Sequence, residues 1–345
     1  MSALLTVDDL RVVFHVDGVR HKAVDGLSFD VAPGEVVAVV GESGSGKSVT
    51  ALSIMGLTRG PSVELAGSIR FDGTELLNAG ESTLRRIRGA EIAIVFQDPL
   101  AALNPVKRIG SQITEQIRAH ERIPMKSAEA RAVECLERVG IPSARERLSA
   151  FPHEFSGGMR QRVMIAMALS CSPRLLIADE PTTGLDVTVQ AQILEQLDSL
   201  RADMGLAVIL VTHDLGVVAD IADRVVVMYG GRAVERANLD EIFDDPQHPY
   251  TWGLLGSIPR TDRPRLRRLA TIPGRPPLPS DLPQGCAFSP RCPHMFARCE
   301  DEPTLEVRVG GGMHEDRCWL RPDDKRVLRN IDGEVGLAIA SARSE

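Results

Sequence analysis

Residues 41–48, GESGSGKS, have the residue types and the spacing of a loop that binds phosphate groups. The glycines allow the backbone to curl so that several N–H groups point at phosphate oxygens, and a helix predicted from about Gly46 adds the positive end of its dipole. In such a loop Lys47 contacts the β- and γ-phosphates of a nucleotide, and the hydroxyl of Ser48 binds Mg²⁺. We therefore predict that a nucleotide is bound by Gly41, Ser43, Gly44, Ser45, Gly46, Lys47, Ser48 and Val49.

Two adjacent acidic residues end the apolar segment RLLIADE, residues 174–180. An aspartate at the end of a buried strand can hold Mg²⁺, directly or through water. This is the role predicted for Asp179, which adds it to the nucleotide-binding residues. Glu180 follows and would orient or deprotonate the attacking water. An ordinary solvated strand end is the alternative, and the phosphate loop elsewhere in the chain argues against it.

The segment FSGGMRQR, residues 155–162, places a serine and two glycines at the start of a predicted helix. Ser156 can cap this helix, which leaves Gly157 and Gly158 free to approach a phosphate closely. The segment resembles the signature motif of ATP-binding-cassette (ABC) proteins, with Met159 in place of the usual glutamine. The resemblance implies that this motif closes on the γ-phosphate held by the phosphate loop of a second subunit.

Further segments are similar to ABC elements in the expected order, so that the resemblance covers roughly residues 4–255. It implies that Gln97 senses Mg²⁺ and water, that Asp186 lies at the interface of two cassettes, that His213 contacts the γ-phosphate and that Phe14 stacks on adenine. The family pattern implies a competent ATPase with catalytic residues Glu180, His213 and Gln97, magnesium ligands Ser48, Gln97 and Asp179, and residues acting in trans on ATP, Ser156, Gly157, Gly158 and Asp186.

These residues need a sheet to position them. The near-continuous apolar runs at 35–40, 174–180 and 206–214 are typical of buried parallel strands, and Asp72-Gly73 and Gly230-Gly231 predict hairpin turns. Helical spacing within residues 105–170, with a C-terminal cap at Gly140, predicts a helical insert between strands. The predicted fold class is α/β, a P-loop NTPase core of the ABC ATPase type with an antiparallel β subdomain and a helical subdomain at about 105–170. It would form a nucleotide-binding domain at 1–255, followed by a small irregular cysteine-rich accessory domain at 256–330 and a tail at 331–345.

Four of the six cysteines lie near the end of the chain with the spacing C-x5-C-x6-C-x18-C, namely Cys286, Cys292, Cys299 and Cys318. This spacing lacks the C-x2-C pairs of common zinc sites. Four thiolates suit either Zn²⁺ or an iron–sulfur cluster, and four buried thiols without a ligand are a further alternative. Cys135 and Cys171 are predicted to be small core residues.

The segments DPQHPYTWGLLGSIP and C-x-F-x-P-R-C, the latter at 286–292, resemble the extension that follows the cassette in oligopeptide and dipeptide importers. The resemblance implies a [4Fe-4S] cluster on the four cysteines, with zinc as the alternative. It also implies two integral-membrane permease subunits, an extracytoplasmic solute-binding protein and a second ABC ATPase subunit, for which a heterodimer is favoured. The chain would then power peptide import.

Composition limits the other functions. The net charge of −7 over 345 residues argues against a nucleic-acid partner. The first residues lack the order of a signal peptide, and no apolar run reaches the roughly 18–20 residues of a membrane helix, so we expect a peripheral protein on the cytoplasmic face of the membrane. A non-transport ABC ATPase of DNA repair or of the ribosome is the first alternative, favoured only by the arginine-rich run at 260–268. Import of another small solute such as nickel and a metal-sensing regulator are the others.

Overall fold

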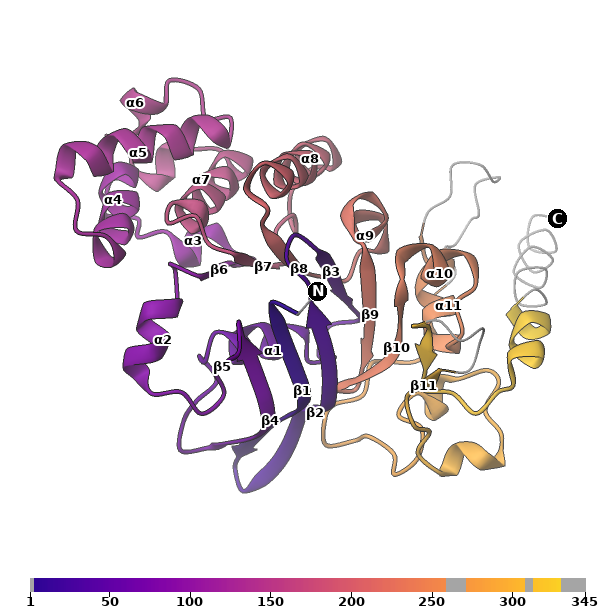
Figure 1. Cartoon of the computed structure of the whole chain (residues 1–345). Helices are drawn as coiled ribbons and strands as arrows, with labels where there is room; N and C mark the ends of the chain where they lie inside the picture. Colours follow the sequence, from indigo (N-terminus) through magenta and orange to yellow (C-terminus); the bar gives the residue numbers. More distant parts are fainter. Residues whose placement is uncertain (1–2, 259–270, 308–312, 330–345) are drawn as a thin grey trace.

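The computed structural model describes residues 3–258, 271–307 and 313–329 (Figure 1). The arginine-rich run at 260–268 and the predicted tail at 331–345 lie outside the described residues. Within the described part of the chain the strands form two sheets. The smaller, antiparallel sheet has the order β2-β1-β4-β5, and its strands are β1 (Leu5–Val16), β2 (Val19–Val31), β4 (Val63–Phe71) and β5 (Thr74–Glu75).

The larger sheet is mixed and has the order β11-β12-β10-β9-β3-β8-β7-β6 over the described ranges. Pairing is parallel from β9 through β3, β8 and β7 to β6, and antiparallel from β9 to β11. Its strands are β3 (Val36–Val40), β6 (Ile92–Val95), β7 (Leu175–Asp179), β8 (Ala207–Thr212), β9 (Arg224–Tyr229), β10 (Arg232–Asn238), β11 (Glu306–Val307) and β12 (Glu315–Asp316).

Strand β3 shows why the central strands are apolar throughout. All five of its residues are buried, because other elements cover both faces of the sheet. Val37 and Val39 pack into the core shared with α1 and the smaller sheet, while the alternate residues of β3 pack into the core on the helical face. The buried parallel strands predicted from the apolar runs are therefore confirmed.

The helices divide between the two faces and one end of the larger sheet (Figure 1). Their bounds are α1 (Lys47–Ile54), α2 (Glu81–Ile87), α3 (Pro99–Ala102), α4 (Ile109–His120), α5 (Met125–Arg138), α6 (Ala144–Arg147), α7 (Gly157–Leu169), α8 (Val187–Met204), α9 (Leu215–Ile221), α10 (Leu239–Asp244) and α11 (Pro249–Gly256). Helices α3 to α7 follow β6 and precede β7 in the chain, so helices are inserted between two strands as predicted. The predicted turns also form: Gly140 follows α5 with a φ of 69°, and Gly73 and Gly231 have φ values of 76° and 81° at the two hairpin turns.

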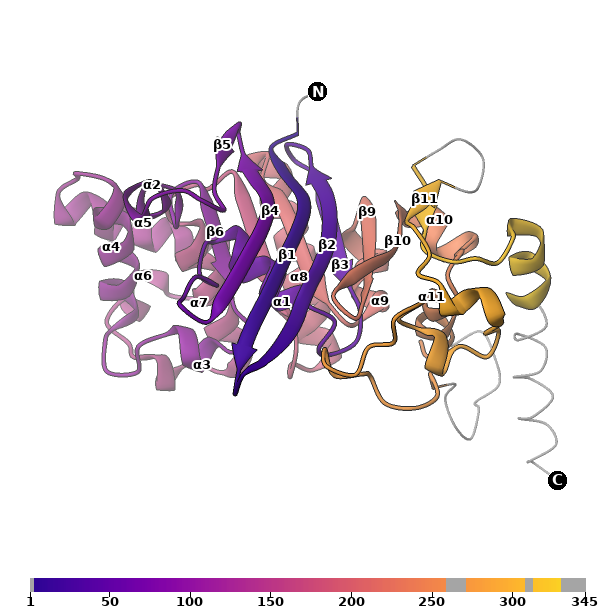
Figure 2. The same ribbon diagram turned by 90° about the horizontal axis from the view of Figure 1, so that it is seen from below.

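The C-terminal segment continues the larger sheet, which the sequence analysis did not predict. β12 pairs with β10, with Asp316 opposite Glu235 and Glu315 opposite Arg236, and β11 pairs with β12. Two-residue strands have no measurable periodicity, so the sequence carried no signal for them. The segment lies at the end of the molecule opposite to α4–α7 (Figures 1 and 2).

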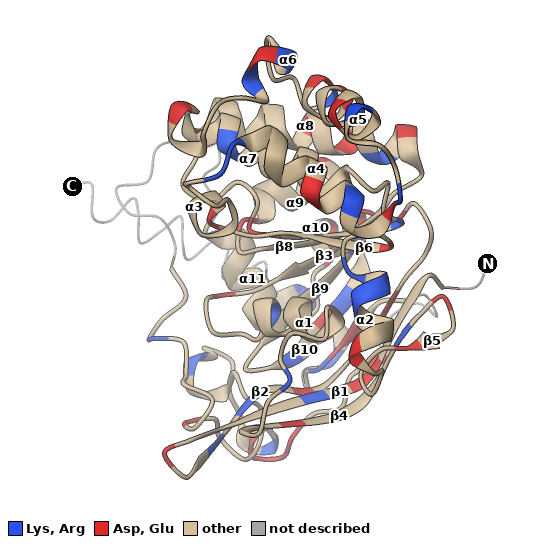
Figure 3. Cartoon of the chain, turned by 90° about the vertical axis from the view of Figure 1, so that its left-hand side faces the viewer, with Lys and Arg blue, Asp and Glu red and all other residues tan. Residues whose placement is uncertain are grey.

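Charges of both signs are interspersed on the ribbon in the view that faces α4–α6 and the smaller sheet (Figure 3). Among the described helices, none is long and apolar enough to cross a membrane.

Candidate nucleotide site and cysteine cavity

The phosphate loop, residues 41–48, joins the end of β3 to the start of α1. A Cβ atom at Gly41 would stand 2.2 Å from the carbonyl oxygen of Met228, and one at Gly46 would stand 2.4 Å from that of Ala23. Only glycine fits at these two positions, where φ is 155° and 101°. The hydroxyl of Ser45 is buried in the loop and has no hydrogen-bond partner among the described residues. The loop therefore presents a compact, backbone-lined surface with an unsatisfied polar group.

Lys47 is the first residue of α1 and is only 5% exposed. Its Nζ donates hydrogen bonds to the carbonyl oxygens of Gly41 at 2.7 Å and Glu42 at 3.0 Å. Burial lowers the pKa of Lys47, although the nearby carboxylates of Glu180 and Asp179 oppose the shift. The ammonium group is thus held at the phosphate loop by acceptors that a phosphate group could replace.

Ser48 and Asp179 meet across the gap between α1 and the end of β7. The Ser48 hydroxyl donates a hydrogen bond of 3.1 Å to Oδ1 of Asp179, whose residue is 8% exposed. Burial raises the pKa of Asp179, while the hydrogen bond from Ser48 opposes the rise. A hydroxyl and a carboxylate at this separation are hard oxygen donors of the type that Mg²⁺ prefers, so the two residues fit a magnesium ion.

Three polar side chains contact the carboxylate of Glu180. Its Oε2 accepts hydrogen bonds from Nε2 of Gln97 at 2.9 Å and from the hydroxyl of Thr183 at 3.0 Å, and its Oε1 lies 3.1 Å from Nδ1 of His213. Gln97 comes just after β6, Glu180 just after β7 and His213 just after β8. Because these parallel strands are neighbours, their carboxyl ends bring the three side chains together.

The backbone at Glu180 is strained, since its φ of 49° lies in the left-handed region. The carboxylate is mostly buried, with 15% of the side chain exposed, while His213 is 55% exposed. Sequence reasoning missed Thr183. The signal that was available is its place three residues after Glu180 in a tight turn, which closes with a backbone hydrogen bond of 3.2 Å between the two residues.

The residues predicted to act in trans lie at the starts of two helices. Ser156 caps α7 by accepting a 3.3 Å hydrogen bond from the N–H of Met159, and Asp186 caps α8 by accepting one of 3.0 Å from the N–H of Val189. Gly157 is exposed and Gly158 is half-buried. A Cβ atom on Gly158 would stand 2.6 Å from Cγ1 of Val189, so the start of α7 packs closely against α8. The structure does not bring these residues into the group around Glu180.

Phe14 lies in β1 opposite His21 of β2 and Val63 of β4. It is half-buried and packs against the core between the two sheets. The β1–β2 hairpin that carries it also reaches the phosphate loop, where the carbonyl oxygen of Ala23 faces Gly46.

The sequence of this chain is similar to those of known transport proteins. Residues 24–183 match the sequence model described as ABC transporter, and residues 234–299 match the one described as oligopeptide/dipeptide transporter, C-terminal region. The oligopeptide transport ATP-binding protein OppD of Bacillus subtilis is 49% identical over 95% of this chain and 92% of its own length. This chain belongs to the ABC transporter ATPases. The ABC ATPase also resembles AppD of B. subtilis, at 48% identity over 94% of this chain and 98% of AppD, and OppD of Mycobacterium tuberculosis, at 53% identity over 87% of this chain and 49% of that protein.

Solved structures of ABC cassettes share the fold. The dimeric post-hydrolysis cassette MJ0796 bound to ADP and Pi superposes with a TM-score of 0.61 and 27% identity over 68% of this chain and 98% of that chain. The cassette cbiO1 of Clostridium perfringens gives a TM-score of 0.61 and 29% identity over 71% of this chain and 92% of its own. The chain is therefore an ATPase with the ABC cassette fold.

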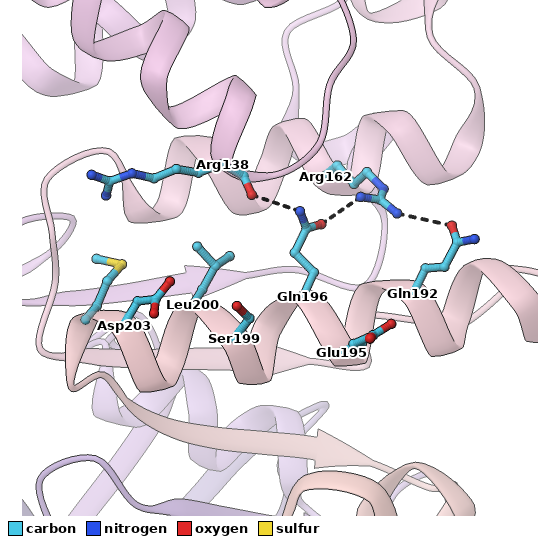
Figure 4. A pocket seen from close by; sticks show the side chains of 9 residues that line it. Arg138, Arg162, Gln192, Glu195, Gln196, Ser199, Leu200 and Asp203 are labelled. Atoms are coloured by element: carbon cyan, nitrogen blue, oxygen red, sulfur yellow. Dashed lines mark hydrogen bonds between the residues drawn. The ribbon is translucent and has the colours of Figure 1, made fainter.

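One pocket of the ABC ATPase lies away from the phosphate loop, between α8 and the helical insert (Figure 4). In it Gln196 and Gln192 of α8 accept hydrogen bonds from Arg162 of α7 at 2.9 Å and 3.2 Å. Gln196 also donates to the carbonyl oxygen of Arg138, at the end of α5. These contacts join α8 to the insert, and the residues predicted for the nucleotide lie elsewhere.

The four C-terminal cysteines line a single small cavity. The cavity is narrow, about 10 Å³, and is otherwise lined mainly by apolar and aromatic side chains, together with two histidines; its lining includes Cys286, Cys292, Cys299, Cys318, His248, His294, Phe288, Phe296 and Trp319. The amide of Cys286 donates a 2.9 Å hydrogen bond to the carbonyl oxygen of Cys299. Among the described residues, no three His, Cys, Asp or Glu side chains converge closely enough to hold one metal ion. The four cysteines therefore share one narrow, largely apolar site.

Burial shifts the pKa values of two of these thiols, those of Cys286 and Cys318. It raises the pKa of Cys286, and it raises the pKa of Cys318 to about 12. Neighbouring sulfur adds to both shifts, Cys299 to that of Cys286 and Cys286 to that of Cys318. The thiols of Cys286 and Cys318 are therefore protonated near neutral pH in this structure.

The other two cysteines differ in burial. Cys135 is buried in α5 within the helical core, which confirms its prediction as a core residue. Cys171 is only half-buried, and its thiol lies 3.9 Å from the carbonyl oxygen of Gln116.

Proposed function

We propose that this ABC ATPase powers import of oligopeptides or dipeptides through separate membrane permease subunits. The observation that carries the ATPase chemistry is the Glu180 carboxylate, joined to Gln97, Thr183 and His213 beside the Ser48–Asp179 pair. Peptide as the cargo is supported by the names of the relatives, which are called oligopeptide transport ATP-binding proteins, and by the match of residues 234–299 to the C-terminal region of such transporters.

In the proposed mechanism the phosphate loop binds the triphosphate through its backbone N–H groups and Lys47. The buried Ser45 hydroxyl supports this role, because a phosphate oxygen would satisfy it. Ser48 and Asp179, together with Gln97, would hold Mg²⁺, which neutralises charge on the phosphates. Gln97 bonds to Glu180 in the present structure, so it would turn from that carboxylate toward the metal when nucleotide binds. Phe14 would stack on the adenine ring. The other residues proposed to bind ATP are Gly41, Ser43, Gly44, Ser45, Gly46 and Val49.

Glu180 would act on the attacking water. A carboxylate that is largely buried and fixed by three neighbours is well placed to orient a water or accept its proton. His213, which is more than half exposed, would contact the γ-phosphate and fix the orientation of Glu180. Thr183, which sequence reasoning missed, would hold Oε2 of the carboxylate in the same position.

A second ATPase subunit would complete the site. Ser156, Gly157 and Asp186 are accessible at the starts of α7 and α8 on a single chain, and they and Gly158 would contact the nucleotide of the partner cassette. MJ0796, which shares the fold, is described as a dimeric structure. We propose a partner that is a similar but different ATPase chain. The complex would bind to two permease subunits at the cytoplasmic face of the membrane and receive peptide from an extracytoplasmic solute-binding protein.

We propose that the cysteine cavity holds a [4Fe-4S] cluster. A single tetrahedral Zn²⁺ needs four sulfur atoms at about 2.3 Å, and hence about 3.8 Å from one another. The described residues offer no such single-ion group, and the four cysteines line one largely apolar site, which supports a cluster in which each iron takes one thiolate. The cluster would supply covalent cross-links to a segment that has few regular elements. Cys286 and Cys318 would have to release protons on binding it, because burial raises the pKa of both thiols.

We propose the domain organisation that the sequence predicts: a nucleotide-binding domain at 1–255 with a helical subdomain at about 105–170, an accessory cysteine-rich domain at 256–330 and a tail at 331–345. The comparisons do not favour a role in DNA repair or on the ribosome, because the relatives reported above are named for oligopeptide transport.

Transport in vesicles tests the proposal. The ATPase would be assembled with its permease and its partner cassette in proteoliposomes, and ATP hydrolysis would be measured with solute-binding protein loaded with peptide or with nickel. Stimulation by the peptide-loaded protein alone supports the proposal. Stimulation by nickel alone would assign the chain to another solute.

A separate measurement tests the cluster. The chain would be purified without oxygen, and iron, acid-labile sulfide and zinc would be measured per chain. About four irons and four sulfides support the cluster. About one zinc without iron would replace it with a structural zinc site.

A further inference from the structure

Arg291 of the cysteine-rich segment reaches the phosphate loop of the cassette. Its Nη1 donates a hydrogen bond of 2.6 Å to Oε2 of Glu42, and its Nη2 donates one of 3.1 Å to Oε1. This is a two-point contact between a guanidinium and a carboxylate, the strongest geometry that such a pair adopts. Only 6% of the Arg291 side chain is exposed and 24% of that of Glu42, so water screens the pair poorly.

Other contacts fix Arg291 in place. Its Nε donates a 2.7 Å hydrogen bond to the carbonyl oxygen of Pro273, and its Nη1 lies 3.4 Å from the hydroxyl oxygen of Tyr229 at the end of β9. Arg291 ends a short 3₁₀ turn, Ser289–Arg291, and Cys292 of the cavity follows at once. The position of the guanidinium is therefore tied to the backbone that carries the cysteines.

Tyr250 of α11 holds the backbone of Glu42. The N–H of Glu42 donates a 2.8 Å hydrogen bond to the hydroxyl of Tyr250 in α11. Tyr250 packs against Tyr229 and Phe288, with ring centroids 4.7 Å and 5.4 Å away. Phe288 also lines the cysteine cavity, so one aromatic cluster touches both the cavity and the residue that holds the loop.

Glu42 also contacts Lys47. Its carbonyl oxygen accepts a hydrogen bond from Nζ of Lys47 at 3.0 Å, and its carboxylate is close enough to influence the pKa of that lysine. An unpaired carboxylate at this place in the loop would repel a triphosphate, because like charges in a poorly solvated site raise the free energy of binding. Arg291 pairs with that carboxylate and neutralises it.

We infer that Arg291 is a positioning residue for nucleotide binding, through which the cysteine-rich segment keeps the carboxylate of Glu42 neutralised and the phosphate loop open to ATP. This inference rests on the proposed role of the phosphate loop in binding ATP. It assigns to the C-terminal segment a part in the nucleotide site that lies 249 residues away in sequence.

A binding measurement on the full chain tests the inference. The dissociation constant of N-methylanthraniloyl-ATP with Mg²⁺ would be measured for the wild type, Arg291→Gln, Glu42→Gln and the double variant. We expect Arg291→Gln to weaken binding about tenfold, since it leaves a carboxylate unpaired beside the phosphates. Glu42→Gln should change binding less than about threefold, and adding it to Arg291→Gln should restore most of the lost affinity.

Rescue by Glu42→Gln distinguishes positioning from a purely structural role. If Arg291 only held the segment together, removing the charge of Glu42 would not restore binding. Unchanged affinity in Arg291→Gln, or a loss that Glu42→Gln does not rescue, would overturn the inference. Arg298→Gln is the matched control, because Arg298 lies in the same segment but stacks on Trp319, with Cζ 3.9 Å from the ring centroid.

Two further variants separate the test of Arg291 from misfolding and from the test of the phosphate loop itself. If Arg291→Gln does not fold, Arg291→Lys retains the charge with one contact, and the inference then predicts a loss of about threefold that Glu42→Gln again rescues. Lys47→Ala should abolish binding in every background. Normal binding by Lys47→Ala would refute the phosphate-loop assignment itself, independently of Arg291.

Discussion

Replacing Glu235 should detach the C-terminal segment from the cassette. Glu235 lies in β10, is 0% exposed and accepts hydrogen bonds from the N–H of Gln247 at 2.5 Å and that of His248 at 3.0 Å. Its Oε1 also lies 2.8 Å from Nε2 of His314, which precedes β12. One carboxylate therefore joins the sheet, the start of α11 and the strand that continues the sheet.

The expected cost of Glu235→Ala follows from these contacts. Each hydrogen bond to a charged group contributes about 1.5–3 kcal/mol, so three set an upper range of about 4.5–9 kcal/mol. Removing the carboxylate also removes its own desolvation penalty, and broken buried pairs cost about 3–5 kcal/mol. We expect the local free energy of opening to fall by about 3–5 kcal/mol.

Hydrogen exchange measures this directly. The amides of Gln247 and His248 donate to Glu235, so their exchange reports the opening of this junction. A loss of about 3 kcal/mol corresponds to more than hundredfold faster exchange. Glu64→Ala, which removes a half-exposed carboxylate on β4, should leave these amides unchanged. Exchange in Glu235→Ala as slow as in the wild type would refute the reasoning.

Three further variants test other parts of the account. Ser48→Ala should weaken Mg²⁺-dependent ATP binding more than binding without metal, in a titration with and without Mg²⁺, because it removes the partner of Asp179; an equal loss would contradict the magnesium role. Cys292→Ser should lower the iron content per chain while leaving ATP binding measurable, and retained iron would exclude Cys292 as a ligand. Burial lowers the pKa of His314, but the hydrogen bond to Glu235 and the negative charges of Glu235, Glu241 and Asp316 together outweigh it, so the folded pKa is raised above its ordinary value of about 6.5. The stabilisation is then full below that value and is lost as pH rises through the folded pKa, so the Tm difference between wild type and His314→Gln should be larger at about pH 6 than at about pH 8; a difference independent of pH would contradict it.

Much of the candidate nucleotide site could be proposed from the sequence because its signals are local. The glycine spacing around Lys47 and the acidic pair at 179–180 each occupy a few consecutive residues, and the ends of neighbouring parallel strands then bring Gln97, Glu180 and His213 together.

Contacts between distant segments were not predictable. Glu42 meets Arg291 across 249 positions and Tyr250 across 208, and a single sequence carries no signal for such pairs. The strands β11 and β12 are two residues long, which is too short for a periodic pattern. The four cysteines could be grouped by spacing, but their arrangement around a shared cavity required the fold.

The central claim is that the carboxylate of Glu180 drives hydrolysis of ATP held by the phosphate loop. The most direct measurement is the single-turnover rate of ATP hydrolysis by Glu180→Gln, assembled with its partner cassette, beside its affinity for Mg²⁺-ATP. The account predicts a rate reduced by about 10²–10⁴ with the affinity retained, because glutamine keeps the shape but cannot accept the proton. A wild-type rate in Glu180→Gln would contradict the assignment of this carboxylate.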